Sequence, residues 1–475
     1  MSKWIWRGFF SIIVLYAIIS GISRHVHMNR LAHELRYGSK SEQVAAAKEL
    51  MVRDRLYDKM QEMPKGERIK AMDAVQETPG ALTVKQCLIL LKDTEATVRA
   101  RVVQTLIPLG KDHVGILVPA MKDSDENVRN GTKDALVGVG PKVIPLVSPK
   151  VNEADMRVAS CDVLVRLKEP SVQPLVKLLQ EGDQDVRMAA ADSLGKIGSK
   201  SATPALLKAT GDIQAVRRVA ISSLCTICDP RSTDLLVEVL SHTRDDGEVR
   251  ARAARALSVI GGPKAIATLT GALGDWDLKV RTSVVTGLQR MGAPVVKPIV
   301  SAMSSSSTPE VRRAGVAALE RINVPEAASA LLALAHDSDP VVRASAARGL
   351  GYQASSNQAQ ALIGLLSDAD GRAADAASEA LAGMEERAVP ALIAALGSSN
   401  SDVVKYRAAD ALARIGSPAV PSLLAKLNAG GDTTKWAAYA LGRIHDPKTK
   451  PALEKLASAG DTDLAWVASR ALARM

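Results

Sequence analysis

Few side chains in this sequence could bind a metal or carry out redox chemistry. Cys225 and Cys228 have the Cys-x-x-Cys spacing of zinc and redox sites, and His25, His27 and His33 lie close together near the N-terminus. However, no second Cys-x-x-Cys or Cys/His pair completes the four ligands of a structural zinc ion. We therefore interpret the two cysteines as small thiols in a helical core and the histidines as part of a polar linker. The sequence predicts no metal site and no cofactor.

The motifs of common catalytic sites are also missing from the sequence. There is no phosphate-binding Walker loop, no dinucleotide-binding glycine fingerprint, no His-Glu-x-x-His and no Gly-x-Ser-x-Gly. The acidic residues are spread over turns and helix surfaces, so the sequence alone identifies no pair that could act as general acid and base. We therefore predict no catalytic residue and favour a protein that is not an enzyme.

Aromatic residues are rare in this chain and are concentrated near its C-terminus. They make up 3% of the 475 residues, and Trp276 is the only one between residues 58 and 351. Tyr406, Trp436, Tyr439 and Trp466 then follow in the last three repeats of the pattern described below. Tryptophan and tyrosine are enriched at the energetically important points of protein interfaces. This uneven distribution predicts one exposed or half-exposed aromatic patch that binds a protein partner.

Basic residues accompany these aromatic residues in the sequence. Arg407, Lys435 and Arg470 lie beside them, and we expect the three cations to surround the rings, since arginine is also enriched at interface anchors. The alternative is that the rings fill the end of the helical stack as a C-terminal cap. In that case they would be buried between helices, and their loss would unfold the last repeats.

A second group of candidate binding residues is basic. The formal net charge of the chain is +10, and Arg250, Arg252 and Arg255 lie close together. We expect these arginines to lack acidic partners on their own helix and to form a secondary basic patch for an anionic ligand. Elsewhere many basic residues follow an acid by four positions, as Lys196 follows Asp192, which stabilises a solvated helix face. Nucleic acid is therefore disfavoured as a partner, and an anionic-ligand or nucleic-acid binder is the third interpretation.

A repeated helical element must position these side chains. A leucine recurs about every 31 residues at the end of a similar phrase, of which Val186-Arg187-Met-Ala-Ala-Ala-Asp-Ser-Leu194 is a good copy. A fixed period of this length indicates a solenoid, whose units bury their apolar faces only by stacking. The marker leucines are Leu106, Leu136, Leu164, Leu194, Leu224, Leu257, Leu288, Leu319, Leu350, Leu381, Leu412, Leu441 and Leu472.

Each repeat is predicted to form two helices, A and B. Helix A is short and apolar and often begins near a proline, such as Pro204 or Pro390, which suits a first helical turn. Helix B carries the Val-Arg phrase; with its arginine numbered 0, positions −1, +3, +7 and +10 form one apolar stripe. The aromatic residues occupy positions +1, +2 and +5, on the charged face. An aspartate ahead of helix B, such as Asp93, Asp123 or Asp275, is expected to cap it.

This pattern resembles the HEAT family, and closely the short HEAT-like repeats of phycobilisome lyases. Val342-Arg343-Ala-Ser-Ala-Ala-Arg-Gly-Leu350 is a matching copy. The resemblance covers about residues 80–475 and implies an all-α, right-handed α-solenoid of about 13 helix pairs. It also implies that the arginine at position 0 of helix B, called the landmark arginine below, reaches an aspartate near the turn of a neighbouring repeat. In the last copies Lys405, Thr434 and Ala465 replace this arginine, and we expect a looser tie there. Since such repeats occur in enzymes and scaffolds alike, an enzyme or enzyme subunit related to bilin lyases is the alternative.

The N-terminal segment is predicted to be a single transmembrane helix. Residues 8–23 contain no charged residue, and counting from Trp4 gives a run of 20 residues, which suits a bilayer core of about 30 Å. A cleaved signal peptide is the alternative, because Lys3 and Arg7 form a basic n-region. We favour a retained anchor with the repeats on the exported side of the membrane, the cytoplasmic side being the other orientation. The aromatic residues of this anchor are Trp4, Trp6, Phe9, Phe10 and Tyr16.

The sequence therefore predicts three regions. Residues 1–24 form the membrane anchor, residues 25–80 a juxtamembrane linker with degenerate capping repeats, and residues 81–475 the HEAT-like solenoid. Together they predict a membrane-anchored, non-catalytic scaffold or adaptor in a membrane-associated complex. Its protein partners are expected to bind the concave face of the solenoid, which helix B lines in the HEAT family.

Overall fold

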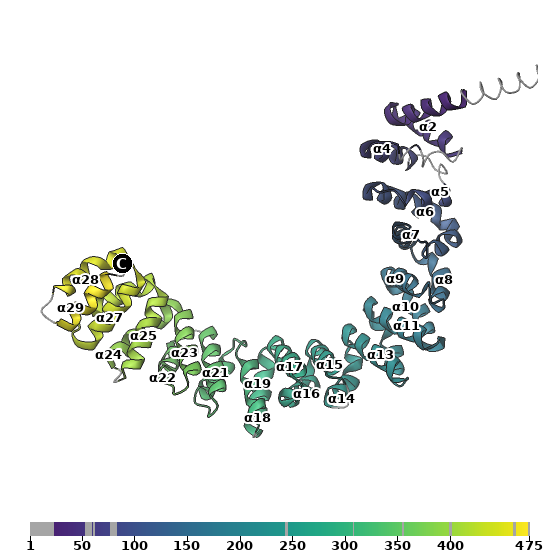
Figure 1. Cartoon of the computed structure of the whole chain (residues 1–475). Helices are drawn as coiled ribbons and strands as arrows, with labels where there is room; N and C mark the ends of the chain where they lie inside the picture. The colour runs from purple at the N-terminus through teal and green to yellow at the C-terminus, as the bar shows by residue number, and fades with distance from the viewer. Residues whose placement is uncertain are drawn as a thin grey trace, which may run out of the picture. The chain divides into compact units, whose positions relative to one another are not determined.

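Every described element of the chain is a helix or a turn between helices (Figure 1). The computed structural model has no strand in this part of the chain, as expected from a sequence without period-two alternation. None of its helices is both long enough and apolar enough to span a bilayer, within the described residues. The described residues are 23–52, 59, 62–76, 83–242, 246–306, 308–353, 356–398, 401–458 and 462–473. Outside them lie the predicted anchor residues Trp4, Trp6, Phe9, Phe10 and Tyr16.

The helices are grouped in two compact units, residues 1–227 and 228–475. In the first unit, beyond α4, A and B helices alternate along the chain, with α6 joining a B helix to the next A helix across a kink at His113. Consecutive B helices such as α11 and α13 pack against each other. The bounds in this unit are α2 (Lys40–Val52), α4 (Lys65–Gln76), α5 (Val84–Leu90), α6 (Ala96–Ala120), α7 (Glu126–Val139), α8 (Ile144–Val147), α9 (Arg157–Leu167), α10 (Val172–Glu181), α11 (Gln184–Ile197), α12 (Thr203–Ala209) and α13 (Gln214–Ile227).

The second unit repeats the same alternation, and its B helices α21 and α23 pack against each other in the same way. The predicted all-α solenoid is therefore confirmed, whereas its right-handed twist stays a prediction. The bounds are α14 (Thr233–Ser241), α15 (Gly247–Ile260), α16 (Gly262–Gly271), α17 (Leu278–Met291), α18 (Val296–Ser305), α19 (Pro309–Leu319), α20 (Pro325–Leu334), α21 (Pro340–Gln353), α22 (Ser356–Leu365), α23 (Gly371–Gly383), α24 (Val389–Ser398), α25 (Asp402–Ile415), α26 (Val420–Lys426), α27 (Gly431–Ile444), α28 (Lys450–Ala457) and α29 (Thr462–Leu472).

The apolar stripe of helix B forms the core. In α11, Val186, Ala190 and Leu194, at positions −1, +3 and +7, are fully buried. The marker leucines from 106 to 441 are all buried at 0% exposure, and Leu472 on α29 is half-buried. Each repeat thus buries its B helix against its own A helix and the B helix of the next repeat. The leucine period in the sequence therefore matches the repeat of the structure.

The turn between helices A and B differs from prediction in one detail. Asp93, Asp123 and Asp275 do not cap helix B; each carboxylate accepts a hydrogen bond from the backbone N–H two residues later, within the turn. The cap lies two residues further on, at Asp125 before α7 and Asp277 before α17. The earlier aspartate shapes the turn, which leaves the later one to accept from the free N–H groups of the first helical turn.

The landmark basic residue joins consecutive repeats. Arg187 Nε on α11 donates to Asp212 Oδ2, in the turn before α13, at 2.7 Å. This is the contact that the HEAT resemblance implied. On α25, Lys405 replaces the arginine, and its Nζ lies 2.5 Å from Asp432 Oδ2 on α27. At this repeat one lysine nitrogen replaces the two guanidinium nitrogens that bind Asp212, and the expected loosening stays a prediction.

The degenerate repeats ahead of the regular array are also helical. Residues 43–50 lie in α2 and residues 68–75 lie in α4, and Leu50 is fully buried. Arg68 on α4 pairs with Asp93 in the turn before α6, with Nε and Oδ2 3.4 Å apart. The same arginine–aspartate tie therefore connects α4 to the first regular repeat. The predicted boundaries of the three regions stay a prediction.

Candidate partner-binding site

The four C-terminal aromatic residues lie on three consecutive B helices. Tyr406 is on α25, Trp436 and Tyr439 are on α27, and Trp466 is on α29. Helix α27 packs against both α25 and α29. Because positions −1, +3 and +7 of each helix face the core, positions +1, +2 and +5 point away from it. We call Tyr406, Trp436, Tyr439 and Trp466 the aromatic patch.

Three rings of the aromatic patch are in contact with one another. The ring centroids are 6.1 Å apart for Tyr406 and Trp436, 5.8 Å for Tyr406 and Tyr439, and 5.7 Å for Trp436 and Tyr439. Both tryptophan–tyrosine pairs are edge-to-face, an arrangement that places the positive ring edge against the negative ring face. The three rings therefore form a preorganised cluster across α25 and α27.

Trp466 is separated from these rings by a cavity. This cavity, of about 300 Å³, is lined by Tyr439 from α27 and by Trp466, Val467, Arg470 and Ala471 from α29. Its lining thus includes one aromatic residue from each of two helices and one arginine. A side chain of moderate size fits such a space.

The rings differ in how far they are exposed. Trp466 is 61% exposed and Tyr406 45% exposed, whereas Trp436 and Tyr439 are half-buried. The indole N–H of Trp436 is buried and has no acceptor in the described part of the chain; such a donor costs about 1–3 kcal/mol. The rings of a terminal cap would be buried and their donors paired, so this geometry favours a surface patch.

Two cations lie over the tryptophan rings. Lys435 Nζ is 5.7 Å from the ring centroid of Trp436, and the guanidinium carbon of Arg470 is 5.2 Å from that of Trp466. Both separations lie within the range of cation–π attraction. The structure thus brings these two predicted site residues to the rings, where they add positive charge to an otherwise apolar surface.

A third cation, Arg443, was overlooked by the sequence reasoning. Its Nη1 donates to the Tyr439 hydroxyl at 3.1 Å and lies 2.8 Å from Asp410 Oδ1. The hydrogen bond with Tyr439 raises the pKa of Arg443, and a hydrogen bond between the two tyrosines raises the pKa of Tyr406. Arg443 follows Tyr439 by four positions, and this helical spacing was the available signal.

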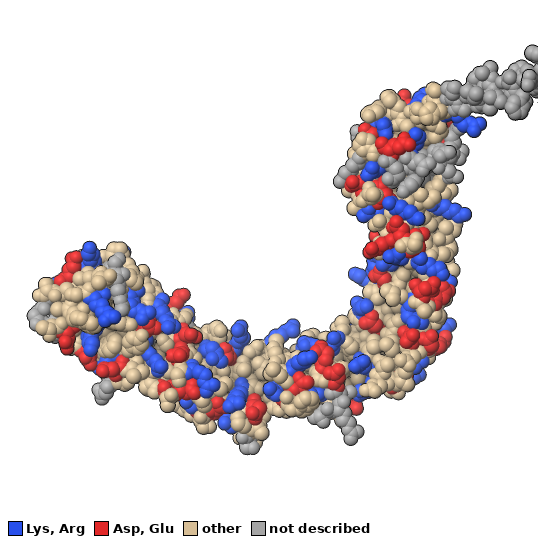
Figure 2. Space-filling view, in the orientation of Figure 1, with Lys and Arg blue, Asp and Glu red and all other residues tan. Residues whose placement is uncertain are grey.

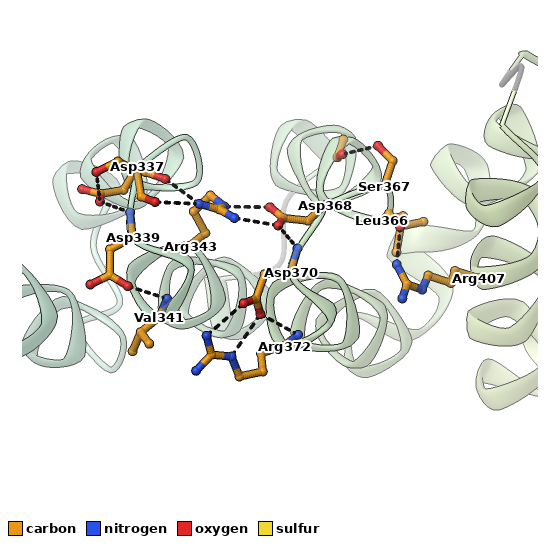
Figure 3. A network of polar contacts seen from close by, with 12 residues as sticks. Asp337, Asp339, Val341, Arg343, Leu366, Ser367, Asp368, Asp370, Arg372 and Arg407 are labelled. Atoms are coloured by element: carbon orange, nitrogen blue, oxygen red, sulfur yellow. Dashed lines mark hydrogen bonds and ion pairs between the residues drawn. The ribbon is translucent and has the colours of Figure 1, made fainter.

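Arg407 was expected beside the aromatic patch, but its guanidinium lies elsewhere (Figure 3). Nη1 donates to the backbone carbonyl of Leu366 at 2.6 Å, just after α22, and Nη2 is 3.7 Å from Asp375 on α23. Carbonyl groups at the C-terminal end of a helix have no partner within the helix, and the arginine supplies one. Arg407 therefore connects α25 to the preceding repeat, and its role among the partner-binding residues stays a prediction.

The predicted secondary basic patch is largely neutralised. Arg250 is fully buried and forms an ion pair with Asp275 of the next repeat. Arg252 and Arg255 both lie near Glu248 Oε1, at 3.2 and 3.5 Å. The expectation that these arginines lack acidic partners on their own helix was wrong, because Glu248 precedes Arg252 by four positions. Elsewhere, Lys and Arg are interspersed with Asp and Glu on the face drawn in Figure 2.

The cysteines and histidines of the described part of the chain do not form a common site. Cys228 lies in the turn after α13 and is half-buried. Cys87 and Cys225 are buried, and burial raises the pKa of the Cys87 thiol to about 12, which suppresses the reactive thiolate at neutral pH. His27 Nε2 lies 2.6 Å from Glu49 Oε1. Within the described residues, no three His, Cys, Asp or Glu side chains are placed to hold a metal ion.

Comparison with known protein families identifies the fold family of the chain. The HEAT-repeat model matches residues 150–214, 212–289, 271–351, 296–382 and 359–435. Since these segments together cover more than half of the sequence, the chain belongs to the HEAT-repeat family. The finer resemblance to phycobilisome-lyase repeats is not tested by this match and stays a prediction.

Comparison with solved structures gives matches to Kap121p and Kap95p, among others. Kap121p bound to Ste12p matches at 14% identity with a TM-score of 0.50, over 90% of this chain and 57% of that chain. Kap95p, in a structure with RanGDP, matches at 14% identity and a TM-score of 0.48, over 94% and 66%. An engineered protein is 22% identical, with a TM-score of 0.22, over 94% and 98%. This chain thus spans little more than half of Kap121p, and the likeness shows a shared fold. No curated protein matches the sequence.

Proposed function

We propose that this HEAT-repeat protein is a non-catalytic scaffold or adaptor that binds a protein partner through its aromatic patch. The observation that carries the proposal is the exposure of Trp466 and Tyr406 beside half-buried rings and the cation Arg470. Leaving large rings in water forgoes their burial free energy, about 1.5–3 kcal/mol for a large apolar side chain. Exposed aromatic surface bordered by arginine is the composition of an interface anchor.

The fold supports the same conclusion. HEAT units present a row of parallel B helices, and residues at equivalent positions of successive helices act together as one extended surface. The related fold of Kap121p was solved with Ste12p bound, so a solenoid of this type can hold a protein partner. The identity of the partner of this chain does not follow from that example.

We further propose that residues 4–23 anchor the protein in a membrane. The uncharged run from Gly8 to Ser23 and the tryptophans at positions 4 and 6 support this, because tryptophan favours the membrane interface. The partner would then belong to a membrane-associated complex. The exported side is the favoured location of the repeats, since a short N-terminal anchor with a basic head most often keeps its N-terminus inside.

Affinity capture from solubilised native membranes tests the proposed binding site. The double variant Tyr406→Ala/Trp466→Ala removes the two exposed rings, so the fold should persist while partner capture falls at least tenfold, about 1.4 kcal/mol. Trp276→Ala is the matched control, because Trp276 is a 67% exposed tryptophan outside the patch. Equal capture by the wild type and the double variant, with helicity unchanged, would contradict the proposal.

A further inference from the structure

The aromatic patch has a defined spacing along the stack. Tyr406, the Trp436–Tyr439 pair and Trp466 come from three adjacent B helices, and packed helices lie about 8–10 Å apart. The ring cluster of Tyr406, Trp436 and Tyr439 lies between α25 and α27, with ring centroids 5.7–6.1 Å apart, and the cavity lies between α27 and α29. These two docking points are therefore about one helix spacing, 8–10 Å, apart. The repeat of a ligand along its axis must match this interval for several of its side chains to dock at once.

Among regular peptide conformations, polyproline II has the matching repeat. It has three residues per turn and a rise of about 3.1 Å, so equivalent side chains recur about every 9 Å. In a β-strand, side chains on one face recur about every 7 Å, and an α-helix turns every 5.4 Å or so. Residues three apart in a polyproline II segment could thus occupy the cavity beside Trp466 and the ring cluster of Tyr406 and Tyr439 together.

The chemistry of the patch also suits proline. The cavity between Tyr439 and Trp466 is about 300 Å³, and aromatic-lined grooves are the usual docking sites of proline-rich segments. Proline rings pack flat on aromatic faces, and the preformed conformation reduces the entropy lost on binding. The preorganised contacts among Tyr406, Trp436 and Tyr439 reduce the corresponding loss on the protein side.

The cations beside the aromatic patch favour a bound peptide of negative charge. Lys435 and Arg470 contact tryptophan rings, and neither forms an ion pair with an acidic side chain in the described part of the chain. Arg443, in contrast, is paired with Asp410. Arg470 therefore keeps its charge for a ligand, whereas Lys435 acts in part on Asp432, which Lys405 also binds. The remaining positive charge favours acidic residues next to the prolines and disfavours a basic segment.

We infer that the aromatic patch binds a proline-rich segment in the polyproline II conformation, with acidic residues beside the prolines. This inference rests on the proposed function, because it names the chemistry of the partner at the same patch. One proline fits the cavity between Tyr439 and Trp466, and a proline three residues away lies over the rings of Tyr406 and Tyr439. Acidic side chains at the ends of the segment face Lys435 and Arg470.

The test is a titration of the detergent-solubilised full chain with three synthetic peptides of equal length. The first has a proline core with glutamate flanks, the second replaces the core with glycine and serine, and the third replaces the glutamates with lysine. We expect the first peptide to bind at least tenfold more tightly than either of the others. Trp466→Ala should abolish most of this preference, whereas Trp276→Ala should retain it. Arg470→Glu should reverse the preference between glutamate and lysine flanks.

The outcomes separate this inference from the proposed function. If the three peptides bind equally or not at all, while partner capture still depends on Tyr406 and Trp466, the polyproline inference is wrong and the partner-binding site stands. If capture is also independent of both rings, the proposed site fails as well. Because Trp466 and Arg470 are exposed, these variants should fold, and unchanged helicity by circular dichroism verifies this.

Discussion

Arg343 and Asp368 form a bidentate ion pair between consecutive repeats (Figure 3). Arg343 Nε donates to Asp368 Oδ2 and Nη2 donates to Oδ1, both at 2.7 Å. Nη1 also donates to the carbonyl of Asp337 at 2.9 Å. One guanidinium on α21 thus connects its own turn to the turn before α23, and its planar geometry matches the carboxylate.

Removing this guanidinium should loosen the two repeats that it joins. We expect Arg343→Ala to lower the free energy of local unfolding of α21–α23 by about 1–2 kcal/mol, since hydrogen bonds to charged groups are lost from a site that water screens only in part. Hydrogen exchange of the backbone amides in these helices measures the change. The matched control is Arg372→Ala. Arg372 is exposed and forms its ion pair with Asp370 on its own turn. The expected contrast is unchanged exchange in this control and faster exchange in Arg343→Ala.

The same pair predicts how stability depends on pH. The hydrogen bond from Arg343 lowers the pKa of Asp368. A carboxylate whose pKa is lower in the folded state stabilises the fold above its unfolded pKa, about 3.9. This contribution is lost as the pH falls through the folded pKa. Asp368→Asn should therefore reduce the difference in α21–α23 exchange protection between pH 6 and pH 3. An unchanged difference would show that the pair contributes nothing.

Much of this fold follows directly from the sequence, because the core depends on short-range periodicity. The buried leucines and the landmark arginine recur at intervals that only a helical repeat satisfies. The role of each turn aspartate could not be predicted in the same way. Asp123 and Asp125 both favour a helix cap by type, and only the path of the turn decides which of them caps α7 and which one binds within the turn.

Truncation of a core leucine near the start of the second unit should destabilise adjacent repeats before distant ones. Leu257→Ala on α15 creates a cavity at a fully buried position and should cost about 2–5 kcal/mol. Because each repeat contacts only adjacent repeats, exchange protection should fall first in α14–α17. Val259→Ala is the control on the same helix, since Val259 is 56% exposed. Equal loss of protection along the whole chain would contradict the repeat-by-repeat coupling.

The N-terminal segment gives a separate prediction. If residues 4–23 are a retained anchor, carbonate or high-salt washing of membranes should not release the protein, because a mainly apolar segment of twenty residues spans the bilayer core. Deletion of residues 1–24 should give a protein that is released and keeps its helicity. A native mature chain that begins at Arg24 would instead identify the segment as a cleaved signal peptide.

The candidate site could be predicted only in part from the sequence. The helical numbering placed four rings on one face, but it could not give the direction of long side chains. Arg407 and Trp436 share position +2 of their helices, yet Arg407 reaches back to Leu366 while Trp436 packs on Tyr439. The difference depends on a free carbonyl of the preceding repeat, which is visible only in three dimensions.

Photo-crosslinking tests the central claim most directly. A photoreactive benzoylphenylalanine replaces Tyr406 or Trp466 in the full chain, and native membranes are irradiated. Because the two positions are exposed parts of one patch, we predict that both give a crosslink to the same partner protein. The same probe at position 276, an exposed aromatic position outside the patch, should not give that product. Crosslinks to different proteins from positions 406 and 466, no crosslink from either, or the same product from position 276 would contradict a partner-binding aromatic patch.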